Sequence, residues 1–282
     1  MRSPRQNPPH GEREQRSAEA AVGAGRHLTD EMPMRYPVLG VDVDAVQVQD
    51  AILKISSWID SGTYGRYVAA ANVHMIVEAV RNPDFKGILR NADMVVPDGM
   101  PLVWRGRRQG AVLPRRVYGP ELMFEFCRAT QDKGYRHFFY GGAPGVAERL
   151  ATSLSSLMRL EVAGMLSPPF KPLSATEDAE LVKQINEVRP DILWVCLGCP
   201  KQERWMYTHR EVLQVPVMVG VGQAFDIFAG TLRQAPVMMR ENGLEWLFRL
   251  CIEPRRLWRR YLLYNSRFLY YSALERCGVR KF

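Results

Sequence analysis

The sequence predicts an α/β fold in which a mostly parallel, Rossmann-like sheet is covered by helices on both faces and followed by a basic helical appendage. Short β-rich runs alternate with longer helical runs from Tyr36 to about residue 235, which is typical of a parallel sheet. After Arg233 the alternation gives way to continuous helix with dense Arg and aromatic residues. Residues 240–282 also carry ten Lys and Arg against four Asp and Glu, which is +6 of the chain's net +8.

Three segments follow from these patterns. Residues 1–35 are rich in Pro, Gly, Arg and Glu and poor in apolar side chains, so we expect a disordered extension. Residues 36–235 form the α/β domain, and residues 236–282 form the appendage. Strands are expected at 66–70, 94–97, 137–140, 161–165, 192–197 and 215–221. Helices are expected at 50–61, 75–81, 83–91, 119–133, 145–159, 177–188 and 201–213.

Composition excludes several classes of protein. With 46% hydrophobic and 24% charged residues, the chain is not wholly disordered. Five unevenly spaced cysteines do not form a secreted disulfide framework, and the N-terminus lacks the apolar stretch of a signal peptide, so we expect a reduced, cytosolic setting. The longest uncharged stretch, 212–225, is too short and glycine-rich for a transmembrane helix.

Polar residues and glycines follow the predicted strands, where ligands bind in open α/β sheets. Asp98, between Pro97 and Gly99, is either a general base or the cap of the next helix. The turn at 141–145 either offers free N–H groups of Gly141 and Gly142 to a diphosphate or is simply a tight turn.

Two short motifs have weaker functional interpretations. Asp42 and Asp44 form a DxD pair that could hold a divalent cation, but 38–48 alternates like an edge strand, so we expect both carboxylates on one solvated face. Cys196 and Cys199 are spaced like a redox pair, yet Cys196 lies within an apolar strand, and no second pair completes a zinc site.

The appendage interleaves arginines with aromatic and aliphatic residues, and Pro254 is expected to start a second helix there. Amphipathic helices of this composition favour an anionic membrane surface. Nucleic acid is not expected, because no DNA- or RNA-binding module is recognisable. Docking to another subunit remains an alternative, and the sequence leaves open whether the chain forms a homo-oligomer.

Several segments together resemble the WecG/TagA/CpsF family of bacterial glycosyltransferases. The resemblance spans 36–269 and is carried by AAANVHMIVEA, ADMVVPDGMPLVW, RRVYGPELM, FFYGGAPG, LGCPKQERWM, VGVGQAFDIFAGTLRQAP and the tail GLEWLFRLCIEPRRLWRRYL. It implies inverting, metal-independent transfer of a sugar, without a cofactor, from a UDP-sugar donor to a polyprenyl-diphosphate-linked sugar. This reaction takes place on the cytoplasmic face of the bacterial membrane, which implies a peripheral membrane protein.

The resemblance also implies roles for individual residues. Asp98 matches the proposed catalytic base. Asn72, Arg116 and Gln202 match residues of the family's substrate pocket. We also expect substrate contacts from residues at the predicted strand ends or in the matching segments, namely Gly141, Gly142, Lys201, Glu203, Gln223 and Asp226. Arginines of the tail match those that close over the site and handle the diphosphate, namely Arg249, Arg256 and Arg259.

Two positions depart from the family pattern, and they bear on the sugar. Ala70 stands where Thr is common, and Gln223 stands where Gly is usual. UDP-ManNAc, UDP-ManNAcA and UDP-glucose therefore remain alternative donors. Two other classes of function remain as rivals: a non-catalytic membrane-bound scaffold, and a nucleotide-dependent oxidoreductase supported only by the α/β pattern and the Gly-rich turn.

Overall fold

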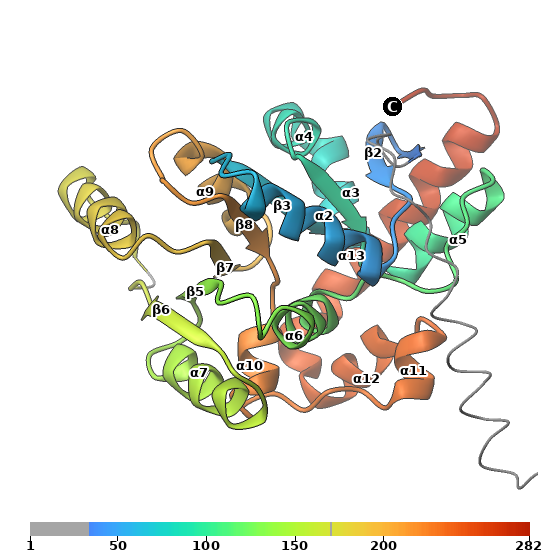
Figure 1. The fold of residues 1–282 in the computed structure, drawn as a ribbon. Coiled ribbons are helices and arrows are strands. Elements are labelled where there is room, and N and C mark those ends of the chain that lie inside the picture. Colours follow the sequence, from blue (N-terminus) through green and yellow to red (C-terminus); the bar gives the residue numbers. More distant parts are fainter. Residues whose placement is uncertain (1–33, 170) are drawn as a thin grey trace, which may run out of the picture. The chain divides into compact units, whose positions relative to one another are not determined.

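A six-stranded sheet with every neighbouring pair parallel forms the centre of the fold (Figure 1). The strand order is β4-β3-β8-β7-β5-β6. The computed structural model describes residues 34–169 and 171–282, so most of the extension expected at 1–35 lies outside the described residues. The predicted α/β fold is confirmed, and the strands are β3 (Arg66–Ala71), β4 (Met94–Pro97), β5 (Arg136–Gly141), β6 (Glu161–Leu166), β7 (Ile192–Cys196) and β8 (Val217–Gly220).

Side chains of each central strand alternate between two apolar cores, one on each face of the sheet. In β3, Tyr67 and Ala69 enter the first core, whereas Val68 and Ala70 enter the second. This burial on both faces explains why the strands are continuous apolar runs. The first core is covered by α3 (Val73–Arg81), α4 (Pro83–Arg90), α5 (Met100–Arg108), α8 (Ala175–Glu187) and α9 (Lys201–His209). The second is covered by α2 (Val48–Asp60), α6 (Gly119–Ala129), α7 (Val146–Leu157) and α10 (Ala224–Phe228).

An antiparallel hairpin, β1 (Arg35–Val38) and β2 (Val41–Asp44), packs beside β4 and corrects the expectation for the DxD pair. Asp42 is exposed, but Asp44 is only 1% exposed. Its carboxylate accepts hydrogen bonds from Arg35 Nε at 2.8 Å and from the backbone N–H of Val95 at 2.7 Å. Asp44 is therefore buried and hydrogen-bonded to the backbone of β4, instead of being exposed to solvent as expected.

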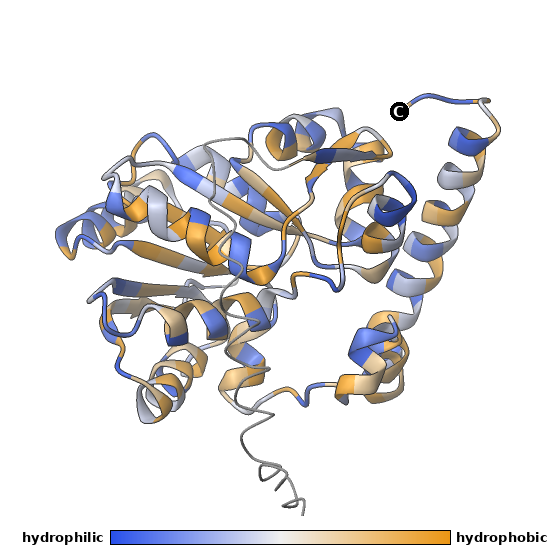
Figure 2. Cartoon of the chain, turned by 45° about the vertical axis from the view of Figure 1, so that its right-hand side comes forward, coloured by the Kyte–Doolittle hydropathy of each residue, from blue (hydrophilic) through white to orange (hydrophobic). Residues whose placement is uncertain are grey.

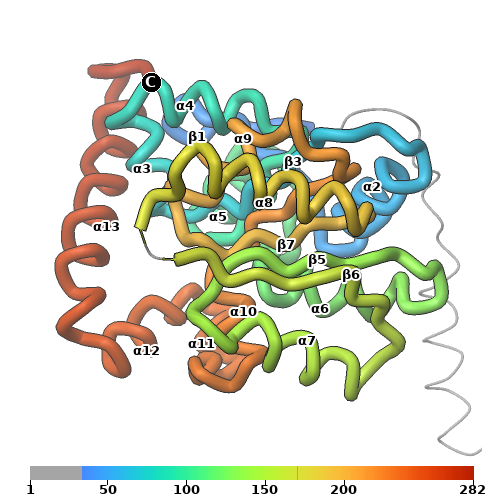
Figure 3. The backbone as a smooth tube through the Cα atoms, turned by 90° about the vertical axis from the view of Figure 1, so that its left-hand side faces the viewer, coloured from blue at the N-terminus to red at the C-terminus, as the bar shows by residue number. Residues whose placement is uncertain are grey.

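The appendage consists of three helices, α11 (Val237–Glu241), α12 (Glu245–Ile252) and α13 (Pro254–Arg276), whereas the sequence predicted two, the second beginning at Pro254. Gly243, with φ of 72°, adopts the left-handed conformation after α11, and Pro254 begins α13 as predicted. Helix α13 runs alongside α3 (Figure 3). Residues 34–282 group as one unit of contacts, and the boundary near residue 235 remains a prediction from the sequence.

Apolar side chains are exposed along much of this appendage. Figure 2 shows hydrophobic and hydrophilic residues mixed along α12 and α13. None of the helices in the described part of the chain is both long enough and apolar enough to span a bilayer. The large apolar side chains that remain exposed on the appendage are Val237, Met238, Leu244, Trp246, Leu247, Ile252, Trp258, Leu262, Leu263, Leu269, Tyr270 and Val279.

Candidate active site

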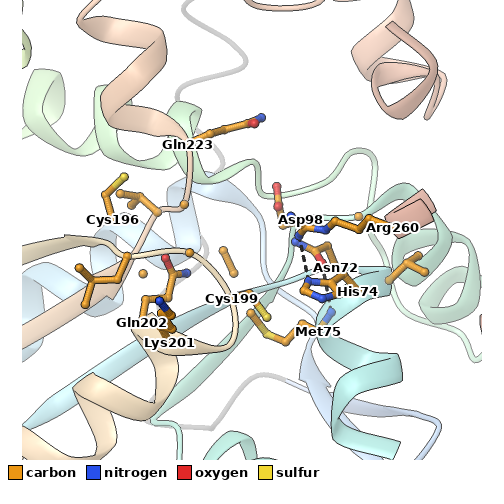
Figure 4. Close-up of a pocket in the computed structure, with 18 of the residues that line it drawn as sticks. Asn72, His74, Met75, Asp98, Cys196, Cys199, Lys201, Gln202, Gln223 and Arg260 are labelled. Carbon is orange, nitrogen blue, oxygen red and sulfur yellow. Dashed lines mark hydrogen bonds between the residues drawn. The ribbon is translucent and has the colours of Figure 1, made fainter. Parts of the chain in front are cut away.

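A cleft of about 1260 Å³ lies beyond the carboxyl ends of the strands. One wall consists of the loops that follow the six strands of the sheet, and the other consists of α12 and α13. We call these the sheet wall and the appendage wall. Figure 4 shows that residues far apart in the sequence, such as Asn72, Asp98, Gln202 and Arg260, meet around this space.

Strand register brings Asp98 and Asn72 together. Ala71 of β3 pairs with Pro97 of β4, so the next residue of each strand emerges at the same edge of the sheet. The backbone N–H of Asp98 donates to the carbonyl of Ala71 at 2.9 Å, and Asn72 Oδ1 caps α3 by accepting from Met75 N at 3.2 Å. The Asn72 side chain also hydrogen-bonds the carboxyl of Asp98.

The carboxyl of Asp98 has an altered acidity. Burial raises its pKa to about 6, and the negative charge of Glu245 adds to this effect. Arg116 opposes the increase, as do hydrogen bonds from Asn72 and from the backbone N–H of Gly119, which lies 3.4 Å from Oδ1. A carboxyl with this pKa is ionised at neutral pH and still basic enough to accept a proton.

Arg116, Tyr118 and Gln223 converge on one carboxylate of the appendage, that of Glu245. Arg116 forms an ion pair with Glu245 and also donates to the carbonyl of Asp98 at 3.3 Å. The Tyr118 hydroxyl and the Gln223 amide donate to Glu245 Oε1 at 3.0 and 3.1 Å. Arg116 also lies over the Tyr118 ring, 4.2 Å from its centroid. This network joins the appendage directly to the surroundings of Asp98.

The glycine-rich turn after β5 offers fewer free N–H groups than the sequence suggested. Gly142 and Ala143 line the cleft, whereas Gly141 does not. The backbone N–H of Gly142 donates to the carbonyl of Cys196 at 3.0 Å, and Pro144 has no N–H. Gly142 contacts the cleft, but its N–H group is already used to join β5 to β7.

The residues at the start of α9 differ in how deeply they are buried. Lys201 is exposed and Gln202 is buried, and both line the cleft, whereas Glu203 lies behind them and is fully buried. Gln202 Nε2 donates to Glu203 Oε1 at 2.7 Å, which leaves Gln202 Oε1 without a partner among the described residues. Burial raises the pKa of Glu203 to about 7. Asp226 of α10 also lines the cleft.

The appendage wall contributes cations, although not the full set implied by the resemblance. Arg249 and Arg256 line the cleft and share Glu253 as an ion-pair partner, at 3.5 and 2.9 Å. Arg259 is exposed, does not line the cleft, and lies over the Trp258 ring at 5.2 Å from its centroid. The position next to it, Arg260, faces the cleft instead.

Arg260 and His74 are two cleft residues to which the sequence analysis assigned no role. Arg260 Nη2 donates to His74 Nδ1 at 2.9 Å, and burial and this arginine lower the pKa of His74 to about 3. His74 is therefore a neutral acceptor that fixes the guanidinium. Helical spacing places Arg260 one turn after Arg256, and thus on the same face of α13, but spacing alone did not distinguish it from Arg259.

The charges that line the cleft favour an anionic ligand. Six basic side chains face four acidic ones, and three of the six come from the appendage wall. Within residues 34–169 and 171–282, no three His, Cys, Asp or Glu side chains form a cluster suited to a metal ion. The six basic side chains are Arg116, Lys171, Lys201, Arg249, Arg256 and Arg260, and the four acidic ones are Asp98, Asp178, Asp226 and Glu245.

Comparison with known proteins gives a consistent result. The model of the glycosyl transferase WecG/TagA/CpsF family matches residues 36–281. An N-acetylglucosaminyldiphosphoundecaprenol N-acetyl-β-D-mannosaminyltransferase of Bacillus spizizenii is 33% identical over 199 residues, which cover 70% of this chain and 75% of the relative. The protein of the same name from Staphylococcus aureus (strain NCTC 8325) is 27% identical over 226 residues, covering 80% and 87%. The chain belongs to the WecG/TagA/CpsF family of glycosyl transferases.

Proposed function

We propose that this chain is an inverting glycosyltransferase that moves a hexose or N-acetylhexosamine-type sugar from a UDP-sugar to a polyprenyl-diphosphate-linked sugar in bacterial cell-surface polysaccharide synthesis. The observation that carries the proposal is a carboxyl group with a pKa of about 6, Asp98, in a cation-rich cleft of a chain whose family match covers residues 36–281. The relatives named above are transferases of N-acetylmannosamine to a diphosphoundecaprenol-linked N-acetylglucosamine, which supports this class of donor and acceptor.

In this reaction, Asp98 is the general base. Its carboxylate accepts the proton of the acceptor hydroxyl while that oxygen forms a bond to the anomeric carbon of the donor sugar. The bond between the anomeric carbon and the β-phosphate oxygen breaks on the opposite face, so the configuration inverts and UDP leaves. Asn72, held as the cap of α3, fixes the position of the Asp98 carboxyl.

Negative charge develops on the β-phosphate as the sugar departs, and cationic side chains stabilise it. We assign this role to Arg116 from the sheet wall and to Arg249, Arg256 and Arg260 from the appendage wall, because all four line the cleft. We assign substrate binding to the residues that line the remaining surface of the cleft, namely Gly142, Lys201, Gln202, Gln223 and Asp226. Glu203 acts behind Gln202 by holding its amide.

We also propose that the reaction needs no metal and that the appendage binds the membrane. Asp44 of the DxD pair is already engaged by Arg35 and Val95, which removes one of the two carboxylates that a cation would require. Exposed Trp and Leu side chains beside arginines on α12 and α13 suit an anionic membrane surface, where the lipid-linked acceptor resides. The protein would then be peripheral.

Release of UDP tests the proposal. Detergent-solubilised protein is incubated with short-chain prenyl-diphosphate acceptors bearing Glc or GlcNAc, across UDP-ManNAc, UDP-ManNAcA and UDP-glucose, with and without EDTA. We expect acceptor-dependent release with one donor, unchanged by EDTA and lost in Asp98→Asn.

Other outcomes distinguish the alternatives. Release that EDTA abolishes would contradict metal independence. If no pair of substrates gives release, calorimetry with UDP separates a scaffold that does not bind UDP from an enzyme whose acceptor differs from those tried. Binding of NAD(H) without binding of UDP would favour the oxidoreductase.

A further inference from the structure

Glu245 is an acidic residue on the appendage wall, whose other charged side chains in the cleft are arginines. It begins α12, it is buried, and it lines the same cleft as Arg249, Arg256 and Arg260. A carboxylate here weakens the attraction for a diphosphate, so its presence needs a reason other than binding that group.

The reason lies in its partners. Both oxygens of Glu245 accept hydrogen bonds from the sheet wall: Oε2 from Arg116, and Oε1 from Tyr118 Oη at 3.0 Å and Gln223 Nε2 at 3.1 Å. The Arg116 and Glu245 side chains are each only 12% exposed, so this is a largely desolvated pair whose breakage leaves a charge without a partner. Arg116 in turn donates to the Asp98 carbonyl at 3.3 Å.

We propose that Glu245 is a positioning residue for the transfer reaction, which holds the Arg116 guanidinium and the Tyr118 hydroxyl in place beside Asp98. The inference rests on the proposed function, because the reacting group that it serves is Asp98. Glu245 also determines how strongly Arg116 lowers the pKa of Asp98. An arginine that is paired with a carboxylate lowers the pKa of a neighbouring carboxyl less than an unpaired arginine does.

The direction of the effect on Asp98 follows from the charges that face it. These are Arg116, from the loop before α6, and Glu245, from α12; the polar groups that face it are Asn72 and the N–H of Gly119. Arg116 lowers the pKa of Asp98 and Glu245 raises it. Removing the charge of Glu245 therefore lowers the pKa of Asp98. In the pH profile of kcat/KM, the acidic limb, where activity falls because Asp98 becomes protonated, then moves to lower pH.

The chain contains a matched control. Arg105 of α5 and Glu275 near the end of α13 form a second ion pair between the α/β domain and the appendage, with both side chains 22% exposed. Neither residue lines the cleft. Glu275→Gln therefore removes a similar anchoring contact without touching the surroundings of Asp98.

The test compares wild type, Glu245→Gln and Glu275→Gln in the full chain by acceptor-dependent UDP release between pH 5 and 9. For Glu245→Gln we expect kcat to fall about tenfold or more and the acidic limb of kcat/KM to move down by about half a pH unit or more. Glu275→Gln should keep the limb and kcat of wild type. Tyr118→Phe keeps the charge of Glu245, so it should keep the position of the limb.

Two results would overturn the inference. One is a loss of activity in Glu245→Gln with an unmoved acidic limb, which would make this residue an anchor of the appendage only. The other is equal behaviour of the two Glu→Gln variants. If wild type transfers nothing, the proposed function fails separately, and ¹³C NMR titration of the carboxyl of Asp98, assigned with Asp98→Asn, still shows whether Glu245→Gln lowers its pKa. Thermal unfolding verifies that each variant is folded.

Discussion

The two walls of the cleft hold their side chains by different means. On the sheet wall, Asp98 and Asn72 follow paired strands whose register fixes both backbones. On the appendage wall, the arginines stand on α12 and α13, where Glu245, Leu257 and Phe268 are the buried residues among those described. The rest of these helices is half-buried or exposed, with large apolar side chains facing outward.

This difference suggests a division of labour. A general base must be placed to within a fraction of an ångström, and a strand end in a doubly covered sheet provides that. A wall with exposed apolar side chains is more stable with a surface to cover them, and a membrane is such a surface. The proposed roles follow this division: proton transfer on the sheet wall, and stabilisation of the leaving diphosphate by the arginines of the appendage wall.

The largest expected effect tests the sheet wall. Asp98→Asn removes the proposed base and should lower kcat by roughly 10³-fold, which is within the range typical of a lost general base. It should leave the affinity for UDP within a few-fold of wild type. Because burial raises the pKa of Asp98, its charged form destabilises the fold at pH 8. The free energy of unfolding of Asp98→Asn at this pH should therefore be about 1–2 kcal/mol higher than that of wild type.

Kinetics and urea unfolding check both effects. A residual rate within tenfold of wild type would show that Asp98 is not the base and would leave the chemistry of the sheet wall unexplained.

A second prediction separates two neighbouring arginines on the appendage wall. Arg260→Ala removes a cleft cation held by His74 and should lower kcat/KM by roughly 10- to 100-fold, because it contributes to stabilising the leaving diphosphate. Arg259→Ala removes the same charge from the outer side and should cost much less. Steady-state kinetics in detergent compares them, and the opposite order would restore the assignment that the resemblance implied for Arg259.

The pH dependence sharpens the role of the sheet wall. The carboxyl of Asp98 must be ionised to accept a proton, and its pKa is about 6. Wild-type kcat/KM should therefore fall about tenfold per pH unit below pH 6 and be level above it. Rates from pH 4.5 to 8 check this, and a limb near the ordinary aspartate pKa would mean that burial has little effect on this group.

A smaller effect tests the outer surface of the appendage. Leu262 is 60% exposed on α13, and Leu262→Glu should weaken binding to phosphatidylcholine–phosphatidylglycerol vesicles by roughly tenfold. Leu53→Glu is the control, because Leu53 of α2 is 53% exposed on a helix that covers the other core. Flotation measures both, and equal losses would show that charge alone, not this face, controls binding.

The smallest effect concerns the buried carboxyl behind Gln202. The pKa of Glu203 is raised to about 7, so its charged form costs stability above pH 7, and this cost disappears as the pH falls towards the unfolded-state value. Glu203→Gln should therefore raise the free energy of unfolding by about 1–2 kcal/mol at pH 8 and by less at pH 5. Urea unfolding at both pH values checks the sign, and a constant difference would indicate a packing effect.

The sequence by itself determined the body of the fold and the location of the carboxyl that we propose as the base. Short apolar runs and helical periodicity are local patterns, so the six strands, most of the helices between them and the polar residues at the strand ends could be predicted from short windows. Asp98 and Asn72 were found because carboxyl ends of parallel strands share one edge. The start of α13 at Pro254 followed from the restricted φ of proline.

Only the tertiary structure decided which polar groups remain free to bind a ligand and which side chains contact one another. Asp44 is buried because the hairpin packs on β4, and the N–H of Gly142 is used because β7 lies beside β5. Arg260 rather than Arg259 faces the cleft, and Glu245 meets Arg116, because α12 and α13 dock beside the strand ends. These partners are separated by up to 186 residues, as in Arg260 and His74, and local periodicity contains no information about contacts at such separation.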